Sequence, residues 1–338
     1  MPCVASGHLD LWPQADAWLD RIPARRNGQI AKRPMKACPM QQYILLSQES
    51  EAYYPLLSKS ASSAKGYTLL ASTSPDADIQ LSYASRRYDW LKPPLPFANK
   101  SKAAAAFISN CGAKNERLEL VAAIQKAGFP VHSYGKCLRN RKDPGDTPAA
   151  KVGELRRHLF TLAFENSNVA GYVTEKYFQC LAVGTVPVYL GAPNIGSFSP
   201  TRDPAQAMVF ANSPSGRNDQ SKASVEARGA AIAARLKALA KDESAYSALL
   251  AWKHRQSLEG PLREVLQQND VGSNCRVCLA VRRAINEGLK SAPKQGQRNS
   301  EKPQKMGLSA LLAAAAAKSD GNPAKSASSI RKKRRKAS

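Results

Sequence analysis

The sequence lacks a long hydrophobic segment. Among its 338 residues there is no run of about 18 or more apolar residues, so no stretch predicts a membrane-spanning helix. The segment from Met1 to Asp20 contains scattered polar residues and no apolar core, and therefore does not predict a signal peptide. Neither an anchor nor a leader is expected within these residues.

Metal-binding motifs are scarce as well. We identify no Asp-x-Asp metal motif near a predicted strand end. Cys275 and Cys278 form one CxxC pair, but a single pair without His ligands is weak evidence for zinc. We therefore predict no metal site and no required cofactor, although stimulation by Mn²⁺ stays open. Cationic side chains would then have to balance any bound phosphate.

Acidic residues are few relative to basic ones, since 26 Asp and Glu against 50 Lys and Arg give a net charge of +24. A basic protein suits a nucleotide diphosphate, a nucleic acid or an acidic membrane surface. Part of the excess belongs to a low-complexity tail, residues 290–338, which ends in IRKKRRKAS. We interpret this tail as a disordered solvated segment or as an arm for nuclear import or nucleic acids.

The most informative stretch runs from Leu159 to Asn194. Its apolar start, Leu159 to Phe164, predicts a fully buried strand that ends in the polar Glu165, Asn166 and Ser167. Thr174 is a good N-cap for a following amphipathic helix, and Val186 to Leu190 predicts a second buried strand. The carboxyl ends of strands are where open α/β sheets bind ligands.

The residue types at this helix start suit a sugar nucleotide. A helix N-terminus offers free N–H groups and a partial positive charge, to which Lys176 adds a full charge, so a diphosphate would be stabilised here. Glu175 and Asn166 have the chemistry to bind ribose or sugar hydroxyls. In the alternative interpretation Glu175 only complements the helix dipole and Lys176 is only solvated.

A second βαβ unit precedes this stretch. Ala103 to Ser109 predicts a buried strand, Asn115 to Lys126 a helix, and Val131 to Tyr134 a returning strand. Arg117 falls in the first turn of that helix and faces the strand end, so it is a candidate second phosphate ligand. An exposed helix arginine without a function is the alternative.

The first half of the chain is shorter and less clearly patterned. Tyr43 to Leu46 predicts a strand that delivers the loop Ser47 to Ser50, and Gly66 to Ala71 and Ile79 to Tyr83 predict two more strands. The Pro-rich Lys92 to Asn99 suits a domain linker. We divide the chain into a poorly patterned segment (1–36), a short α/β half (37–98), a nucleotide-binding domain (99–289) and the tail (290–338).

These motifs resemble those of a known family. The pieces FEN, YVTEK and VPVYLGAPNI are similar to the signature of the α1,3-fucosyltransferases, glycosyltransferase family 10. The resemblance implies a GT-B fold, in which two Rossmann-like domains face a cleft. The N-terminal half of this chain is short for that fold, which is a departure from the family. It also implies that GDP-fucose is bound by Asn166, Tyr172, Glu175 and Lys176, with Lys176 at the phosphates and Glu175 at the ribose.

Two further matches extend the resemblance. SNCGAKNERL resembles the segment whose Arg contacts the donor diphosphate, which implies that role for Arg117. SQESEAYY resembles the acceptor-domain segment whose Glu-Ser pair supplies the catalytic carboxylate, which implies that Glu49 is the general base. Glu51 is the neighbouring competitor for this role, and an exposed loop acid is the alternative for Glu49. Arg86 and Arg87 depart from the family, where an aromatic residue is common.

The segments NCGAKNERL, YGKCLRNR and CRVC look closest to plant-type core α1,3-fucosyltransferases. The resemblance therefore implies inverting transfer of fucose from GDP-β-L-fucose to the innermost GlcNAc of protein N-glycans. Transfer to outer GlcNAc by a Lewis-type enzyme is one alternative. An inactive GDP-sugar-binding remnant, or a basic nucleic-acid-associated protein, is another, although the folded part does not suggest nucleic acid as a partner.

The family resemblance also implies a setting. It implies a Golgi membrane enzyme with its anchor upstream, and a short-range disulfide between Cys275 and Cys278, consistent with a secretory lumen. Cys111 and Cys137 both follow predicted strand ends and are a second candidate pair, whereas Cys180 is predicted to be an ordinary core residue. Asn99 begins a glycosylation sequon, which matters only in a lumen.

Overall fold

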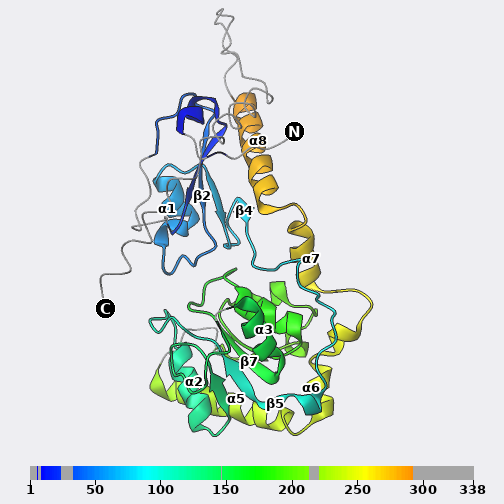
Figure 1. Ribbon diagram of the computed structural model, residues 1–338. Coiled ribbons are helices and arrows are strands. Elements are labelled where there is room, and N and C mark those ends of the chain that lie inside the picture. Colours follow the sequence, from blue (N-terminus) through cyan, green and yellow to red (C-terminus); the bar gives the residue numbers. More distant parts are fainter. Residues whose placement is uncertain (1–5, 7–8, 24–32, 146, 213–220, 292–338) are drawn as a thin grey trace, which may run out of the picture.

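The computed structural model describes residues 6, 9–23, 33–145, 147–212 and 221–291. It contains two parallel sheets, one of four strands in the order β1-β2-β3-β4 and one of five in the order β6-β5-β7-β8-β9. Each sheet and its helices form a separate unit, and the two units lie one above the other (Figure 1). The predicted α/β class with two Rossmann-like units is confirmed. The tail lies outside the described residues.

The first unit contains the N-terminal sheet. Its elements are η1 (Leu9–Gln14), β1 (Ala17–Arg21), β2 (Gln42–Leu46), η2 (Pro55–Leu57), α1 (Lys59–Ala64), β3 (Leu69–Ser72) and β4 (Ile79–Gln80). Strand β1 lies in the segment that the sequence left without a predicted strand. It pairs in parallel with β2, and only Asp20 of its five residues is buried. An edge strand this exposed has little apolar alternation by which to predict it.

The second unit contains the nucleotide-type sheet. Its elements up to the last strand are η3 (Phe97–Asn99), β5 (Ser101–Ala106), α2 (Arg117–Lys126), β6 (Val131–Ser133), α3 (Pro148–Arg156), β7 (His158–Phe164), α4 (Glu175–Val183), β8 (Val186–Leu190), η4 (Ile195–Phe198), η5 (Pro204–Gln206) and β9 (Val209–Phe210). Every residue of β7 and β8 is buried, as the apolar runs predicted. Strand order reverses direction between β5 and β7, which makes the loops after these two strands the switch point.

The remaining elements are helical. They are α5 (Lys222–Leu239), α6 (Glu243–Ala248), η6 (Ala251–His254), α7 (Pro261–Gln268) and α8 (Ser273–Ser291). Helix α8 was assigned to the second unit from the sequence, but it packs on the first sheet (Figure 1). Val277 and Val281 share a core cluster with Ile44 and Leu69. The chain therefore crosses back to the first unit through α7.

Among the described residues, no helix combines the length and apolarity needed to cross a bilayer. The expectation that no Asp-x-Asp motif lies near a strand end is wrong, because Asp76-Ala77-Asp78 lies in the turn before β4. Asp78 there pairs with Lys59 and accepts a hydrogen bond from the backbone N–H of Leu70 at 2.7 Å. This carboxylate thus has a structural role in the first unit.

A buried lysine binds carbonyl oxygens at the C-terminal end of α4. Lys253 Nζ donates to the carbonyl oxygens of Trp90, Leu181 and Ala182 at 2.7, 2.9 and 3.1 Å. Burial lowers the pKa of Lys253 to about 8. Three acceptors nevertheless favour the ammonium, because only the charged form has three N–H donors. A cation at this end also complements the helix dipole, whose positive end lies at the candidate site.

A second buried lysine gives a testable pH dependence. Lys100 Nζ has two partners, the carbonyl oxygen of Gly184 and the hydroxyl of Tyr246, and a neutral amine satisfies both. Burial, together with the charges of Lys253 and Arg156, lowers the pKa of Lys100 to about 7, against about 10.4 in an unfolded chain. Between these values only the unfolded state binds the proton, so the free energy of unfolding is expected to rise with pH.

Urea denaturation at intervals from pH 7 to pH 9 measures this rise. Lys100→Met is the control. The pH dependence of its free energy of unfolding should lack the contribution of Lys100 and keep that of every other group. Parallel pH profiles for the two proteins would mean that Lys100 stays charged in the folded state.

Candidate functional site

The loops after β5 and β7 meet at the switch point of the second sheet. The backbone N–H of Lys114 donates to the carbonyl oxygen of Asn166 at 2.8 Å. Asn115 Nδ2 donates to the carbonyl oxygen of Glu165 at 3.1 Å and to Asn168 Oδ1 at 2.8 Å. These bonds hold the two loops as one polar surface at the carboxyl ends of the strands, where a ligand is expected.

Helix α4 begins at this polar surface. Residues at its start contact a buried carboxylate, that of Glu165. Thr174 caps the helix, as the sequence predicted, and its N–H and Oγ1 donate to Glu165 at 2.7 and 2.8 Å. Glu165 is fully buried, and burial raises its pKa although Lys176 and Thr174 oppose the shift. Glu165 was not among the predicted site residues. Its role here is to fix Thr174 and Lys176.

Lys176 lies between two carboxylates. Its Nζ is 3.3 Å from Glu165 Oε2 and 3.4 Å from Glu175 Oε1. Burial opposes the charge, but both carboxylates raise the pKa of Lys176, so the side chain is an ammonium at neutral pH. The side chain remains partly exposed. A permanent cation is therefore available at the N-terminus of α4, as a diphosphate site requires.

Lys151 of α3 is a second cation at this site, and no sequence pattern marks it. Its Nζ is 3.9 Å from Glu175 Oε1, so the Glu175 carboxylate lies between Lys151 and Lys176. Burial of Glu175 opposes its ionisation, but the two ammonium groups hold its pKa below the ordinary value. Glu175 is thus an oriented carboxylate that can accept hydrogen bonds from hydroxyl groups.

Arg117 is at the first position of α2, next to the same loops. Only 1% of its surface is exposed, and its guanidinium donates to the carbonyl oxygens of Asn110 and Phe164. Burial lowers its pKa, while its Nε has no partner among the described residues. The arginine joins the strand ends of β5 and β7. Its phosphate-binding role remains a prediction.

Glu49 follows β2 and approaches the site from the first unit. Its backbone N–H donates to Ser47 Oγ at 3.0 Å, which shapes the loop, and its side chain is partly exposed. Tyr83 donates to the carbonyl oxygen of Gln48 at 3.0 Å. Burial raises the pKa of Tyr83, and so do the carboxylates of Glu49 and Glu175. Carboxylates from both units, Glu49 and Glu175, therefore raise the pKa of the same phenol.

Tyr172 lies in the loop between β7 and α4. It is buried, and burial raises its pKa, with further contributions from Glu165, Tyr83 and Glu49. Asn166 is partly exposed, as a ligand-binding side chain must be. The structure thus gathers the predicted Glu49, Tyr172 and Glu175 around the junction of the units.

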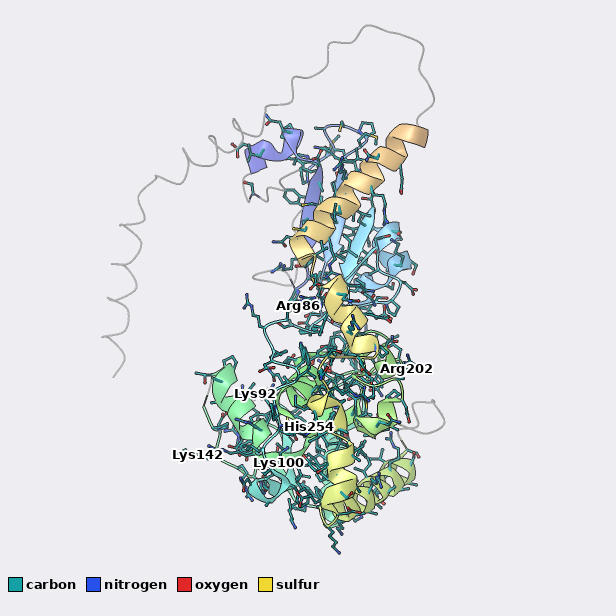
Figure 2. The ribbon with its side chains drawn as sticks, turned by 90° about the vertical axis from the view of Figure 1, so that its right-hand side faces the viewer. Arg86, Lys92, Lys100, Lys142, Arg202 and His254 are labelled. Carbon is teal, nitrogen blue, oxygen red and sulfur yellow. A yellow bond between two sulfur atoms is a disulfide. The ribbon has the colours of Figure 1, made fainter. Side chains whose placement is uncertain are left out.

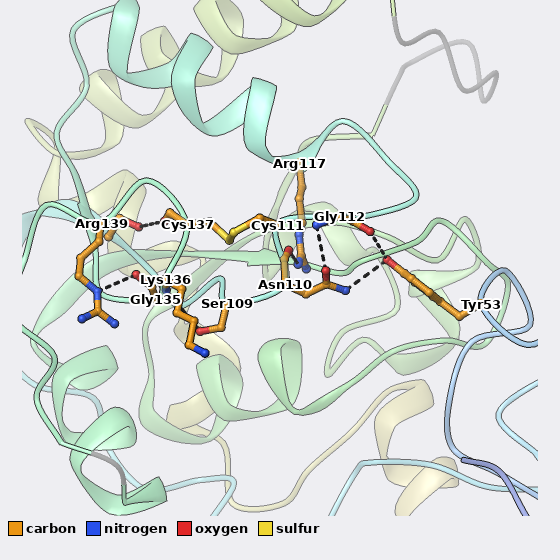
Figure 3. The surroundings of a disulfide bond; sticks show 11 residues. Tyr53, Ser109, Asn110, Cys111, Gly112, Arg117, Gly135, Lys136, Cys137 and Arg139 are labelled. Carbon is orange, nitrogen blue, oxygen red and sulfur yellow. Dashed lines mark hydrogen bonds between the residues drawn. A yellow bond between two sulfur atoms is a disulfide. The ribbon is translucent and has the colours of Figure 1, made fainter. Parts of the chain in front are cut away.

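The units touch at three places beside these residues. Ser50 Oγ and Ser167 Oγ are 2.7 Å apart, and the hydroxyl of Tyr53 donates to the carbonyl oxygen of Gly112 at 3.0 Å (Figure 3). Gly171 has a φ of 78°, and a Cβ there would lie 2.1 Å from the Thr73 carbonyl oxygen. Only glycine fits this contact.

The disulfide predictions had different outcomes. Cys111 and Cys137 are bonded, which ties the loop after β5 to the loop after β6 (Figure 3). The predicted pair Cys275–Cys278 is wrong, because Cys275 is a free, exposed thiol, whereas Cys278 is disulfide-bonded. Both lie in α8, where residues three apart have Cβ atoms about 5–6 Å apart, farther than a disulfide allows. Cys180 is free and buried, as predicted.

Two other predicted features concern the surface. Asn99 is exposed at the end of η3, so its side chain is accessible to modification, and glycosylation there stays a prediction. In the described ranges, no group of three or more His, Cys, Asp or Glu residues has the arrangement of a metal site.

Comparison with known proteins adds to this geometry. Residues 97–213 match the model described as the C-terminal part of glycosyltransferase family 10 (fucosyltransferase). A fucosyltransferase-like protein of Arabidopsis thaliana is 37% identical over 254 residues, which are 74% of this chain and 45% of that protein. GDP-fucose protein O-fucosyltransferase 3 of Bos taurus is 30% identical over 203 residues, which are 54% of this chain and 39% of that protein.

The chain thus spans less than half the length of these two relatives. A crystal structure of an α1,3-fucosyltransferase aligns with 77% of this chain and 78% of its own, with a TM-score of 0.43 and 15% sequence identity.

Proposed function

We propose that this chain, whose residues 97–213 match the model of glycosyltransferase family 10 (fucosyltransferase), binds GDP-fucose at the start of α4 and transfers the fucose to an acceptor hydroxyl. The observation that carries the proposal is the first turn of α4. Its N-terminus and the Lys176 ammonium form an anion site beside the oriented Glu175 carboxylate. In this assignment Lys176 binds the diphosphate, and Glu175, Asn166 and Tyr172 bind the ribose and fucose.

The proposed reaction is one in-line displacement that inverts the configuration at the anomeric carbon. The Glu49 carboxylate takes the proton of the acceptor hydroxyl, whose oxygen bonds to fucose C1. The bond between C1 and the phosphate oxygen breaks, and GDP leaves with the electron pair. Lys176 and the N–H groups of α4 stabilise the charge that develops on GDP, with Arg117 as the proposed second cation. We assign no step to a metal ion.

For the acceptor we propose the core GlcNAc of protein N-glycans, fucosylated in α1,3 linkage, on the basis of the sequence resemblance to plant-type enzymes. A second candidate is a hydroxyl of the protein itself. The similarity to GDP-fucose protein O-fucosyltransferase 3 favours it. Both candidates use the same donor site and the same base, so they differ only in what the first unit presents to Glu49.

A secretory compartment is part of the proposal. The Cys111–Cys137 disulfide supports it, because disulfides persist in oxidising compartments and are rare in the cytosol. The Golgi membrane location implied by the resemblance belongs to the same proposal.

One experiment tests the donor and the acceptor together. The chain is incubated with GDP-fucose and, in separate reactions, a core N-glycan glycopeptide, an N-acetyllactosamine oligosaccharide and an unglycosylated protein with accessible Ser and Thr. Mass spectrometry then locates any added fucose. We expect fucose on the innermost GlcNAc of the glycopeptide. Fucose on lactosamine or on protein hydroxyls would correct the acceptor, and GDP binding without transfer to any of them would refute the enzymatic proposal.

A further inference from the structure

A cleft of about 480 Å³ lies between the two units. The first unit contributes Pro75, Gln80 and Ser82, which follow β3 or belong to the segment of β4. The second unit contributes Asn194 and Ser197 from around η4, and Gln268 from the last turn of α7. The residues of α7 that line this cleft lie beyond the matched residues 97–213, whereas Asn194 and Ser197 lie within them.

The lining of the cleft suits a neutral, polar ligand. Among the residues that the structure describes, Glu264 is the only charged one that lines it, and none of them offers a cation for a phosphate. The side chains of Gln80, Ser197 and Gln268 make no hydrogen bond to any described residue, and carboxamides both donate and accept. Pro75, Pro261 and Val265 add apolar surface, whereas Leu81 and Phe198, which also line the cleft, are each only 5% exposed. Paired carboxamides and apolar faces match the hydroxyl groups and C–H faces of a carbohydrate.

The loop that carries the proposed base contacts the lining of the cleft. Ser82 lines it, and the carbonyl oxygen of Ser82 accepts a hydrogen bond from Gln48 Nε2 at 3.3 Å. The next residue, Tyr83, donates to the carbonyl oxygen of Gln48, which directly precedes Glu49. Ser82 of the cleft lining and the adjacent Tyr83 therefore both contact Gln48, the residue before the proposed base Glu49.

The cleft also connects to the donor loop. Asn194 lines it, and its Oδ1 accepts a hydrogen bond from the backbone N–H of Gly171 at 2.8 Å. Gly171 directly precedes Tyr172, which the sequence assigns to the donor. The wall of the cleft is thus shared with the loop that would hold fucose.

Contacts between the units hold α7 in place along the cleft. Asn269 Nδ2 donates to the carbonyl oxygen of Ala84 at 2.9 Å, and Arg86 pairs with Asp270. Figure 2 labels Arg86 at the level where the units meet. These contacts fix the position of Gln268 relative to the first unit, as a specificity-determining side chain requires.

We propose that this cleft is an acceptor subsite that binds a neutral oligosaccharide, namely the sugars adjoining the one that receives fucose. The role of this subsite in the reaction rests on the proposed function, but oligosaccharide binding to the cleft can be measured separately. Gln80 and Gln268 provide the hydrogen bonds from opposite walls, and Pro75, Pro261 and Val265 provide apolar surface.

A matched pair of variants tests the subsite. Gln268→Trp places a bulky side chain into the cleft, whereas Gln267→Trp puts the same side chain on the neighbouring, exposed position of α7, which does not line the cleft. Only Gln268→Trp is expected to raise the KM for a core N-glycan glycopeptide, by about tenfold or more, or 1.4 kcal/mol. The KM for GDP-fucose and the Kd for GDP should be unchanged in both variants.

Ligand-observed NMR with the released core oligosaccharide, in the presence of GDP, separates this proposal from the proposed function. If the unaltered protein transfers no fucose but binds the oligosaccharide, and Gln268→Trp loses that binding, the subsite stands and the enzymatic proposal fails. Unaltered oligosaccharide binding in Gln268→Trp would overturn the subsite, as would absence of binding to the unaltered protein. Competition by an unglycosylated acceptor peptide would assign the cleft to peptide instead.

Discussion

Glu49→Gln is expected to reduce fucose transfer by about 10²- to 10⁴-fold, which is the usual contribution of a general base. Gln has nearly the same shape as Glu but cannot accept a proton at neutral pH. The Glu49 backbone bond to Ser47 does not involve the carboxylate, so the loop should keep its conformation. The loss should appear in kcat, whereas the Kd for GDP, measured by calorimetry, should not change.

Glu51→Gln is the matched control, because Glu51 lies in the same loop and is partly exposed as well. If Glu51→Gln loses transfer while Glu49→Gln retains it, the base has been assigned to the wrong carboxylate. Retained transfer in both variants would remove the first unit from the chemistry.

Lys176→Met should impair both the reaction and the stability of the fold. Loss of a preorganised cation at a leaving group typically costs about 10²- to 10³-fold in kcat. The fully buried Glu165 would also lose its ammonium partner at 3.3 Å. An uncompensated buried charge costs about 3–5 kcal/mol, part of which Glu165 can avoid by taking up a proton. We therefore expect weaker GDP binding, slower transfer and a lower Tm.

Two further variants separate these effects. Lys176→Arg keeps the charge and should restore most of the Tm, with partial recovery of transfer. Lys126→Met removes an exposed lysine whose ion pair with Glu226 spans 3.1 Å, and such a pair contributes about 0–1 kcal/mol. Equal loss of Tm in Lys126→Met and Lys176→Met would contradict the structural role of the Lys176–Glu165 pair.

The second unit was predicted closely because its signals are local. β7 and β8 are buried on both faces, so they appear as continuous apolar runs in the sequence. The helix between them begins at the predicted cap, Thr174, and ends at Gly184, which has a φ of 70°. Side chains next to these boundaries, such as Lys176, could be placed for the same reason.

Residues whose role depends on distant partners were not predictable in this way. Glu165 adjoins a predicted site residue, but its role depends on Thr174 and Lys176, which meet it only after β7 and α4 are packed. Lys151 reaches Glu175 from α3, a helix that the sequence did not link to the donor site. The predicted pair Cys275–Cys278 was wrong because it followed the family resemblance. In α8 the helical geometry keeps these two side chains too far apart for a disulfide.

Because α8 packs on the first sheet, one cut in the chain cannot separate the two units intact. The core around Ile44 and Leu69 is completed by Val277 and Val281, more than two hundred positions later in the chain. The first unit is therefore discontinuous in sequence and encloses the second as an insertion. A breakpoint placed at the Pro-rich segment, or anywhere before Ser273, separates the first sheet from its own covering helix. An autonomous first unit would need both stretches joined by a new linker.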